Sequence, residues 1–268
     1  MGSVVVAPLS TLQKYTKHAA RHAVRFIELD LLRAVAILFM VFLHVLWDLD
    51  YFGIFPLNRG VYQFQNLVPA LFFILVGICL VITTRKRSPF SPDKQGRHLF
   101  YRGLWILGFG MIITVVTMIF LPDRPIFFGV LHCIGLSIIL CIPFLKFKAY
   151  NAIIAIGIII FGLGIGTVSV NNPTLVHLIV GFHPGNMFSM TIDYFPLLPW
   201  FGVILFGVAL GNVLYKDGKR QFPFPDLSKY KPVGFFSWIG KHSLAIYLIH
   251  QPIIAGILEG YLFLSKII

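Results

Sequence analysis

Charged side chains are scarce in this 268-residue chain, where Asp, Glu, Lys and Arg together make up 12% of the residues. Soluble domains carry about 25% of these residue types, so the shortage argues against a soluble globular enzyme. A disordered chain is excluded as well, because 57% of the residues are hydrophobic. Cysteine is also rare, and Cys79, Cys133 and Cys141 form no CxxC pair. The sequence therefore predicts neither a disulfide framework nor a zinc site, and we expect no bound metal.

Long apolar runs are what the chain has instead. A helix that crosses a membrane needs about 20 mainly apolar residues. The runs found here are continuously apolar rather than alternating, which favours helices over the strands of a membrane barrel. The sequence predicts an all-α polytopic membrane bundle of about seven helices, with one domain over residues 25–268 after a cytoplasmic tail of residues 1–24. The predicted spans are Leu29–Leu49, Asn66–Thr84, Leu99–Leu121, Ile126–Leu145, Tyr150–Val170, Phe195–Tyr215 and Phe236–Phe263.

The stretch Asn171–Thr191 is ambiguous. It contains no Lys, Arg, Asp or Glu, yet prolines, glycines and asparagines interrupt it. Only Thr174–Phe182 is compactly apolar, and that is too short to cross a bilayer. We expect this stretch to be an extramembrane or re-entrant segment.

The basic residues fall on alternate loops. Three of them, Arg59, Arg124 and Lys266, occupy the remaining loops and the C-terminal tail. By the positive-inside rule the N-terminus is cytoplasmic and the C-terminus lies outside. The basic residues of the cytoplasmic loops then account for most of the net charge of +12. We therefore expect no nucleic-acid partner, and we expect contact with membrane lipids. The residues on the inner side are Lys14, Lys17, Arg21, Arg25, Arg85, Lys86, Arg87, Lys94, Arg97, Arg102, Lys146, Lys148, Lys216, Lys219, Arg220, Lys229, Lys231 and Lys241.

Ionisable residues at membrane depth are costly and mark functional sites. In the first span, His44 and Asp48 are four residues apart and lie on one helix face. A carboxylate beside an imidazole fixes its tautomer and favours its protonated form, which suits a general base. The alternative is a histidine satisfied by a hydrogen bond across the bundle. Arg33 lies about 16 Å from His44 along the same face. It either anchors the helix start, paired with Asp30, or binds an anion.

Three more ionisable residues lie in or beside later spans. His132 is about two turns into the fourth span, Asp193 stands just before the sixth, and His250 is near the middle of the last. Interhelical hydrogen bonds explain each of them taken alone. His44, Asp48, His132 and Asp193 nevertheless share the outer side of the predicted topology, which favours one common site.

Arg97 and Arg102 open the third span on the predicted cytoplasmic side. Arginine forks suit phosphate, so the two residues are candidates for binding a phosphate-bearing molecule. The other explanation, which needs no specific site, is positive-inside charge or lipid headgroup binding. A basic inner mouth opposite a His/Asp cluster fits transfer of a group from a cytoplasmic phosphorylated donor to an outside acceptor. It also fits a proton-coupled transporter.

Five motifs stand out in chain order: RFIELDLLRAVAI at 25–37, HVLWDL at 44–49, FGVLHCIG at 128–135, FPLLPWFG at 195–202 and GKHSLAIYLIHQP at 240–252. Together they resemble the heparan-α-glucosaminide N-acetyltransferase-like membrane family over roughly residues 25–260. The spacing of Arg33 and His44 and the closing YLIHQP are also similar to the membrane acyltransferase-3 family. The short chain is similar to a prokaryotic plasma-membrane relative.

The resemblance implies transfer of an acyl group from cytoplasmic acyl-CoA to a sugar or glycan across the membrane. A histidine in the first long span is the catalytic residue that the family implies, and His44 matches it. Arginines at the cytoplasmic ends of spans would hold the coenzyme A phosphates, and Arg33, Arg97 and Arg102 are the matching residues. We therefore expect a multi-pass plasma-membrane acyltransferase that uses acetyl-CoA.

In this hypothesis His44, oriented by Asp48, deprotonates an acceptor amine or hydroxyl that attacks the thioester. Whether an acetyl-histidine forms instead stays open. His132, Asp193 and His250 would bind the acceptor. Two other classes remain: a transporter or flippase whose histidines relay protons, and a non-catalytic membrane scaffold. The sequence leaves open the acceptor, the acyl chain length and the oligomeric state, a homodimer included.

Overall fold

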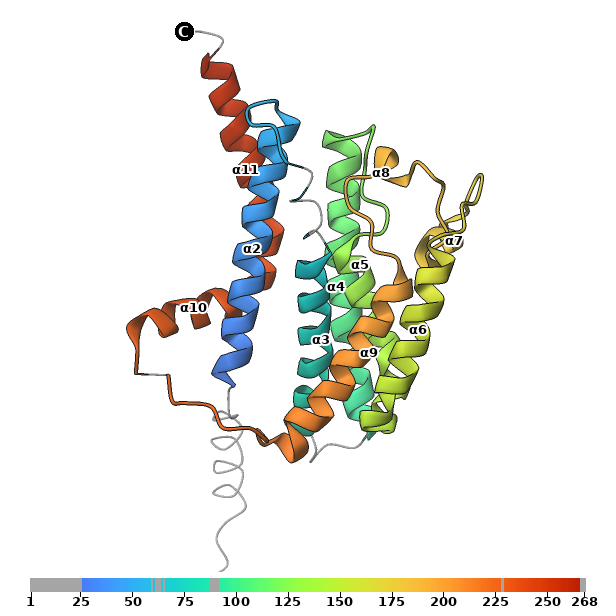
Figure 1. The fold of residues 1–268 in the computed structure, drawn as a ribbon, viewed down its shortest axis with the longest axis vertical. Helices are drawn as coiled ribbons and strands as arrows, with labels where there is room; N and C mark the ends of the chain where they lie inside the picture. Colours follow the sequence, from blue (N-terminus) through green and yellow to red (C-terminus); the bar gives the residue numbers. More distant parts are fainter. Residues whose placement is uncertain are drawn as a thin grey trace, which may run out of the picture.

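The computed structural model describes residues 26–58, 60, 64, 66–86, 92–227 and 229–265. Over these ranges no β-strand forms. Six helical stretches of the described chain are long and apolar enough to cross a membrane, which confirms the predicted all-α polytopic fold (Figure 1). The predicted tail of residues 1–24 lies outside the described residues. The elements are α2 (Ile27–Tyr51), α3 (Leu67–Lys86), α4 (Pro92–Phe120), α5 (Val130–Phe144), η2 (Leu145–Tyr150), α6 (Asn151–Ile165), α7 (Leu175–Val180), α8 (Met187–Met190), α9 (Leu197–Leu214), η3 (Lys216–Gly218), α10 (Lys231–Lys241) and α11 (Ser243–Ser265).

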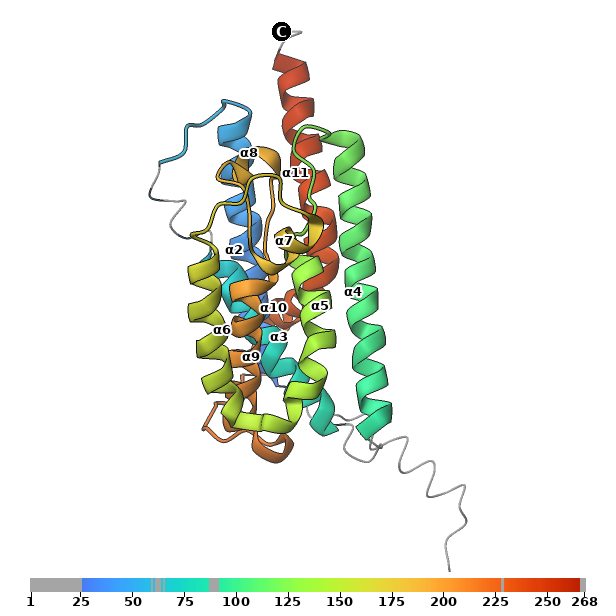
Figure 2. The same cartoon turned by 90° about the vertical axis from the view of Figure 1, so that its right-hand side faces the viewer.

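The fourth and fifth predicted spans form one helical stretch, Val130–Ile165, which is why the seven predicted spans correspond to six stretches. This stretch folds back on itself at Lys148, whose φ of 49° and ψ of −123° are not helical. Figure 2 shows α5 and α6 both rising from the turn η2, with α9 between them, so the chain runs in opposite directions in the two helices. The buried Asn151 amide closes this turn, because it donates to the carbonyls of Phe144 and Lys148 at 2.9 Å each.

The stretch between α6 and α9 does not cross the membrane. Its two helices, α7 and α8, have 6 and 4 residues, far fewer than a span needs. The Thr174 hydroxyl caps α7 by accepting a hydrogen bond from the His177 backbone N–H at 3.4 Å. Both short helices lie at the end of the molecule where α6 ends and α9 begins (Figure 1). The prediction that residues 171–191 contain no span is confirmed.

The seventh predicted span, Phe236–Phe263, begins too early. The structure divides this region into α10 and α11, with His242 as the C-cap of α10. Gly240 lies so close to α2 that a Cβ at this position would collide with the Asp30 carbonyl. That contact lays α10 across the start of α2, at a steep angle to α11 (Figure 1). Hydropathy misplaced the boundary because an apolar helix packed across a neighbour has the same composition as the start of a span.

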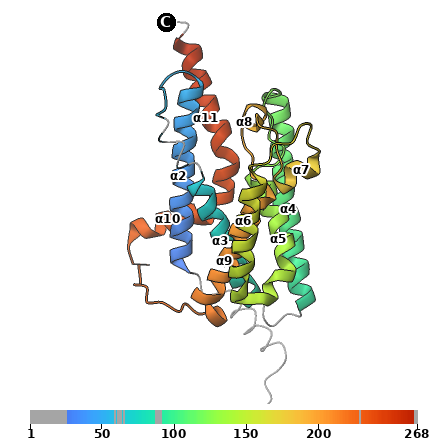
Figure 3. The same cartoon turned by 45° about the vertical axis from the view of Figure 1, so that its right-hand side comes forward.

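The helices form two groups, which we call the bundle (α3, α4, α5, α6 and α9) and the arm (α2, α10 and α11). Within the bundle, α3 and α9 approach closely at Gly77 and Gly207. A Cβ at Gly77 would meet the Ile204 carbonyl, and a Cβ at Gly207 would meet the Ile74 carbonyl. The arm lies to one side of the bundle, with α2 and α11 next to each other (Figures 1 and 3). Apolar residues of α2, including Leu29, join the arm to α3.

Candidate active site

Two of the predicted site residues meet within the arm. The rings of His44 on α2 and His250 on α11 lie edge to face, with 4.8 Å between their centroids. The indole ring of Trp47 lies 5.2 Å from the His44 ring. Both histidines are candidates from the sequence alone, but their contact depends on the pairing of the first and last helices. The arm therefore places two imidazoles and an indole side by side at membrane depth.

Backbone carbonyls fix the tautomers of both rings. Nδ1 of His44 lies 2.9 Å from the Met40 carbonyl oxygen, and Nδ1 of His250 lies 2.6 Å from the Tyr247 carbonyl oxygen. A carbonyl oxygen only accepts, so each Nδ1 carries the hydrogen. In the neutral rings the lone pair is therefore on Nε2, the atom that a general base uses. Nε2 of His250 is buried and has no hydrogen-bond partner within the described chain.

Asp48 is held by α11 rather than by His44. The Gln251 Nε2 amide donates to both Asp48 carboxylate oxygens, at 3.0 and 2.9 Å. The expectation that Asp48 fixes the His44 tautomer by hydrogen bonding needs correction, because Met40 performs that task. A helical side chain points back toward the preceding turn, so the ring reaches the carbonyl four residues earlier. Asp48 stays a source of negative charge close to His44.

Sequence reasoning missed Gln251 as a site residue. Its only signal was its place directly after His250 in the closing motif. The amide links α2 to α11, while its own Oε1 is buried without a partner in the described part of the chain. The same holds for Trp47 Nε1. One donor (Trp47 Nε1) and two acceptors (His250 Nε2 and Gln251 Oε1) thus remain unsatisfied around His44.

His132 lies in a different environment, at the start of α5. The Gly129 backbone N–H donates to Nδ1 of His132 at 3.2 Å, so in the neutral ring Nε2 carries the hydrogen. Nε2 lies 3.2 Å from the Thr114 hydroxyl, which in turn donates to the Ile126 carbonyl at 2.7 Å. Both ring nitrogens of His132 are used in joining α4 to the beginning of α5.

Asp193 binds the same helix start from the loop before α9. Its Oδ2 accepts a hydrogen bond from the Val130 backbone N–H at 3.3 Å. A carboxylate suits this position because the first N–H groups of a helix are unpaired and partly positive. Burial raises the pKa of the Asp193 carboxyl to about 6, and the Val130 hydrogen bond works against that rise. The charge of Asp193 also reaches Tyr247, whose ring lies 5.7 Å from that of His250.

The three predicted donor-binding arginines are placed unequally. Nη1 of Arg33 lies 3.3 Å from Asp30, and its Nη2 donates to the Cys79 sulfur at 2.6 Å. Arg102 on α4 interacts electrostatically with both Arg33 and Cys79. Arg97 is exposed. Arg33 and Arg102 therefore form a pair of like charges between the arm and the bundle, whereas Arg97 stands at the surface.

An ion pair that the sequence did not predict joins α2 to the segment between α9 and α10, and its carboxylate, Glu28, is buried. Arg220 donates to both Glu28 oxygens at 2.7 Å, and the Tyr215 hydroxyl adds a hydrogen bond of 3.1 Å. The guanidinium also stacks near the rings of Phe26 and Phe224. Sequence reasoning counted Arg220 only among the loop charges, because nothing in the sequence places it beside Glu28. Separately, the described residues contain no group of three or more His, Cys, Asp or Glu placed to hold a metal ion.

Comparison with known families gives this arrangement a context. The family model for the heparan-alpha-glucosaminide N-acetyltransferase catalytic domain matches residues 25–252. The chain belongs to this family. No curated protein and no solved structure matches it.

Membership of the heparan-alpha-glucosaminide N-acetyltransferase family makes this chain a membrane acetyltransferase by class. The match includes every predicted site residue, from Arg33 to His250, and it includes Gln251 as well. It ends at Pro252, so the rest of α11 lies beyond it.

Proposed function

We propose that this protein transfers an acetyl group from acetyl-CoA to an amine or hydroxyl of a sugar or glycan on the other side of the membrane. The N-terminus is cytoplasmic in this proposal, and the membrane is the plasma membrane. Acetyl-CoA enters from the end of the molecule that carries Arg85, Lys146 and Lys148, which we call the basic end. The family's membrane acetyltransferase class supports the reaction type.

One observation carries the assignment of the site: the unsatisfied polar atoms around His44. Buried polar groups are almost always hydrogen-bonded, so several orphans in one place point to a polar ligand. The donor Trp47 Nε1 suits a carbonyl oxygen, and the acceptors His250 Nε2 and Gln251 Oε1 suit N–H or O–H groups. A thioester carbonyl and a sugar offer these complementary groups.

In the proposed reaction Nε2 of His44 takes the proton from the acceptor N–H or O–H group. The freed lone pair attacks the thioester carbonyl, and the indole N–H of Trp47 stabilises the negative charge that develops on its oxygen. The carbon–sulfur bond then breaks. The coenzyme A thiolate leaves and takes the proton back from His44. Asp48, held by Gln251, acts as a positioning residue whose charge stabilises the protonated His44 ring.

The donor arginines lie at the other end of the path. Arg33 and Arg102 are proposed to bind the coenzyme A phosphates, with Arg97 at the entrance. The two arginines carry like charges and repel each other beside Cys79, and this repulsion supports binding of an anion between them. From Arg33 the pantetheine arm follows α2 for about 16 Å to reach His44. His132 and Asp193 support the acceptor side by holding the start of α5, with Asp193 facing Tyr247.

The test is acetyl transfer by purified protein in proteoliposomes, with labelled acetyl-CoA and a panel of amino sugars and neutral sugars. We expect His44→Ala to reduce transfer by about a hundredfold to ten-thousandfold, as loss of a general base does. His242→Ala is the matched control, because His242 makes the same ring contact with a carbonyl four residues earlier but is exposed on α10. Full activity in a folded His44→Ala variant would overturn the proposal.

A proton-coupled transporter is the second candidate. The direct contact of His44 with His250 favours it, since two adjacent imidazoles form the start of a proton relay. In this case a pH gradient drives substrate uptake into proteoliposomes, and acyl-CoA neither binds nor is consumed. The acetyl-transfer assay and the uptake assay therefore separate the two candidates.

A further inference from the structure

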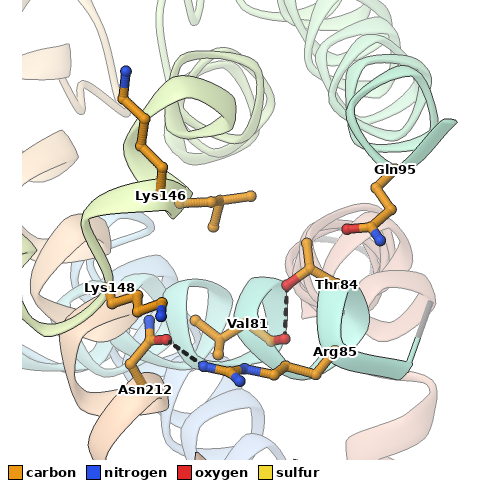
Figure 4. Close-up of a pocket in the computed structure, with 8 residues that line it drawn as sticks. Val81, Thr84, Arg85, Gln95, Lys146, Lys148 and Asn212 are labelled. Atoms are coloured by element: carbon orange, nitrogen blue, oxygen red, sulfur yellow. Dashed lines mark hydrogen bonds between the residues drawn. The ribbon is translucent and has the colours of Figure 1, made fainter. Parts of the chain in front are cut away.

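A basic cavity opens at the basic end, away from the histidines. It has a volume of about 320 Å³ and lies between the end of α3, the start of α4, the turn η2 and the end of α9 (Figure 4). Among the residues that the structure describes, three cations and no carboxylate line this cavity. The lining residues are Val81, Thr84, Arg85, Gln95, Leu145, Lys146, Lys148 and Asn212.

The guanidinium of Arg85 is fixed in place on one side of the cavity. Nη1 donates to Asp217 at 2.8 Å and Nη2 donates to the Asn212 side-chain oxygen at 3.0 Å. Asn212 is itself anchored, because its Nδ2 donates to the Val208 carbonyl at 2.9 Å. The Asp217 side chain is 73% exposed, so solvent screens its charge and leaves Arg85 with positive potential toward the cavity. Arginine held in this way retains further N–H donors for an anion.

The turn η2 supplies the opposite side. Lys148 has a positive φ of 49°, an uncommon conformation for a residue with a side chain. Figure 4 shows its ammonium group directed toward Asn212, on the side where Arg85 lies, while the Lys146 chain extends away. No ion pair engages Lys146 or Lys148 among the described residues. Lys148 is itself exposed, and its charge adds to that of Arg85, whose carboxylate partner, Asp217, is largely screened by solvent. The two cations repel each other, and an anion between them reduces that repulsion.

The geometry points to a phosphate-binding site in this cavity, with Arg85 and Lys148 as its anchors. It is separate from Arg33, Arg97 and Arg102, and it does not depend on the transfer reaction. The shared chemistry is a phosphate group that arrives either on a nucleotide, such as the 3′-phosphate of coenzyme A, or on an anionic lipid. If these cations reflect only the positive-inside rule, replacing a cavity lysine and replacing a surface lysine at the same end should have the same effect on anion binding.

The experiment compares Lys148→Gln with Lys219→Gln, which removes the same charge from another exposed lysine that does not line the cavity. Binding to the full-length purified protein is measured by titration with adenosine 3′,5′-bisphosphate, coenzyme A and dephospho-coenzyme A. Thermal stability is measured in nanodiscs of phosphatidylglycerol and of phosphatidylcholine. Arg85→Gln is a second cavity variant, and Lys148→Gln keeps the test informative if that variant does not fold.

A nucleotide site predicts that Lys148→Gln weakens binding of the bisphosphate and of coenzyme A by about tenfold, a change of 1.4 kcal/mol. Dephospho-coenzyme A then binds both proteins equally. If the site binds lipid, the wild type should be more stable in phosphatidylglycerol nanodiscs than in phosphatidylcholine nanodiscs. Lys148→Gln should lose this difference, and its affinity for coenzyme A should equal that of the wild type. Equal behaviour of Lys148→Gln and Lys219→Gln in every arm would overturn the proposal. Because every readout is binding, a protein without transferase activity can still pass this test.

Discussion

Helices α3 and α9 of the bundle touch backbone to backbone at glycines, whereas α2 and α11 of the arm meet through side chains, polar ones among them. Burial differs in the same sense: half of the most apolar part of α3 is buried inside the protein, against 6% for α11. Close glycine contacts leave no room for a ligand, while the histidine and glutamine contacts leave unsatisfied polar atoms. The tightest backbone contacts thus lie in the bundle, and the groups that we propose to react lie in the arm, beside the little-buried α11.

The largest expected effect follows from filling a glycine contact in the bundle. In Gly207→Val the new Cβ collides with the Ile74 carbonyl, so two backbones must separate. The expected loss of stability is above the roughly 3 kcal/mol of ordinary overpacking. Size-exclusion chromatography should show little folded monomer. Gly256→Val on α11 is the control, since nothing lies within 4 Å of its Cβ. If the two variants fold equally well, the contrast between bundle and arm is wrong.

Next in size is the effect of breaking the ion pair between Glu28 on α2 and Arg220, in the segment that follows α9. Arg220→Gln leaves the Glu28 carboxylate, 6% exposed, without its guanidinium, which we expect to cost about 3 kcal/mol. Chemical denaturation of the purified protein measures this loss. Asp217→Asn breaks the exposed pair with Arg85 and should change stability by less than about 1 kcal/mol. A cost as small for Arg220→Gln as for Asp217→Asn would show that the arm is held by other contacts.

Gln251→Leu should act on activity rather than on stability. In this variant Asp48 loses both hydrogen bonds from α11, so its carboxylate moves relative to His44. We expect kcat to fall by about tenfold to a hundredfold, as for small misplacements of catalytic groups, with KM for acetyl-CoA unchanged. Gln251→Asn is the conservative variant. A rise in KM for acetyl-CoA with normal kcat would instead place Gln251 on the donor side.

The smallest expected effect concerns Asp193 and pH. Its pKa in the folded protein is about 6, above the ordinary 3.8, so the folded state binds this proton more tightly than the unfolded state. The stabilisation is complete below the unfolded pKa and is lost as pH rises through about 6. From about pH 7 to about pH 5 the wild type should gain about 2–4 °C in melting temperature relative to Asp193→Asn. If the melting temperatures of the two proteins change by the same amount over this pH range, the raised pKa of Asp193 is wrong.

The sequence predicted the helices well wherever an apolar run ends at charges or turn residues. The run Leu29–Leu49 became α2, Ile27–Tyr51, for this reason. The prediction was wrong at the start of the last span, because that part of the run packs across α2 instead of crossing the membrane. The fold-back at Lys148 lies between the fourth and fifth predicted spans, where the sequence predicted a loop that carries Lys146 and Lys148.

The site was predictable only in part, because a sequence shows which residues are ionisable but not which helices pair. His44 and His250 stand out as costly groups at membrane depth, and both lie in the arm. Gln251 and Arg220 carry no such signal, since their importance comes from the carboxylates of Asp48 and Glu28 that the fold places opposite them. The roles proposed for these residues in catalysis stay predictions until the variants are measured.

The fold-back pair α5 and α6 has a consequence for the surrounding lipid. Each leg has 15 residues and is about 22 Å long, less than the roughly 30 Å thickness of a bilayer's hydrocarbon core. A hydrophobic segment shorter than the core thins the bilayer around it. We therefore expect the membrane to be thinnest beside α5 and α6, and the protein's activity to depend on the acyl chain length of the lipids in which it is reconstituted.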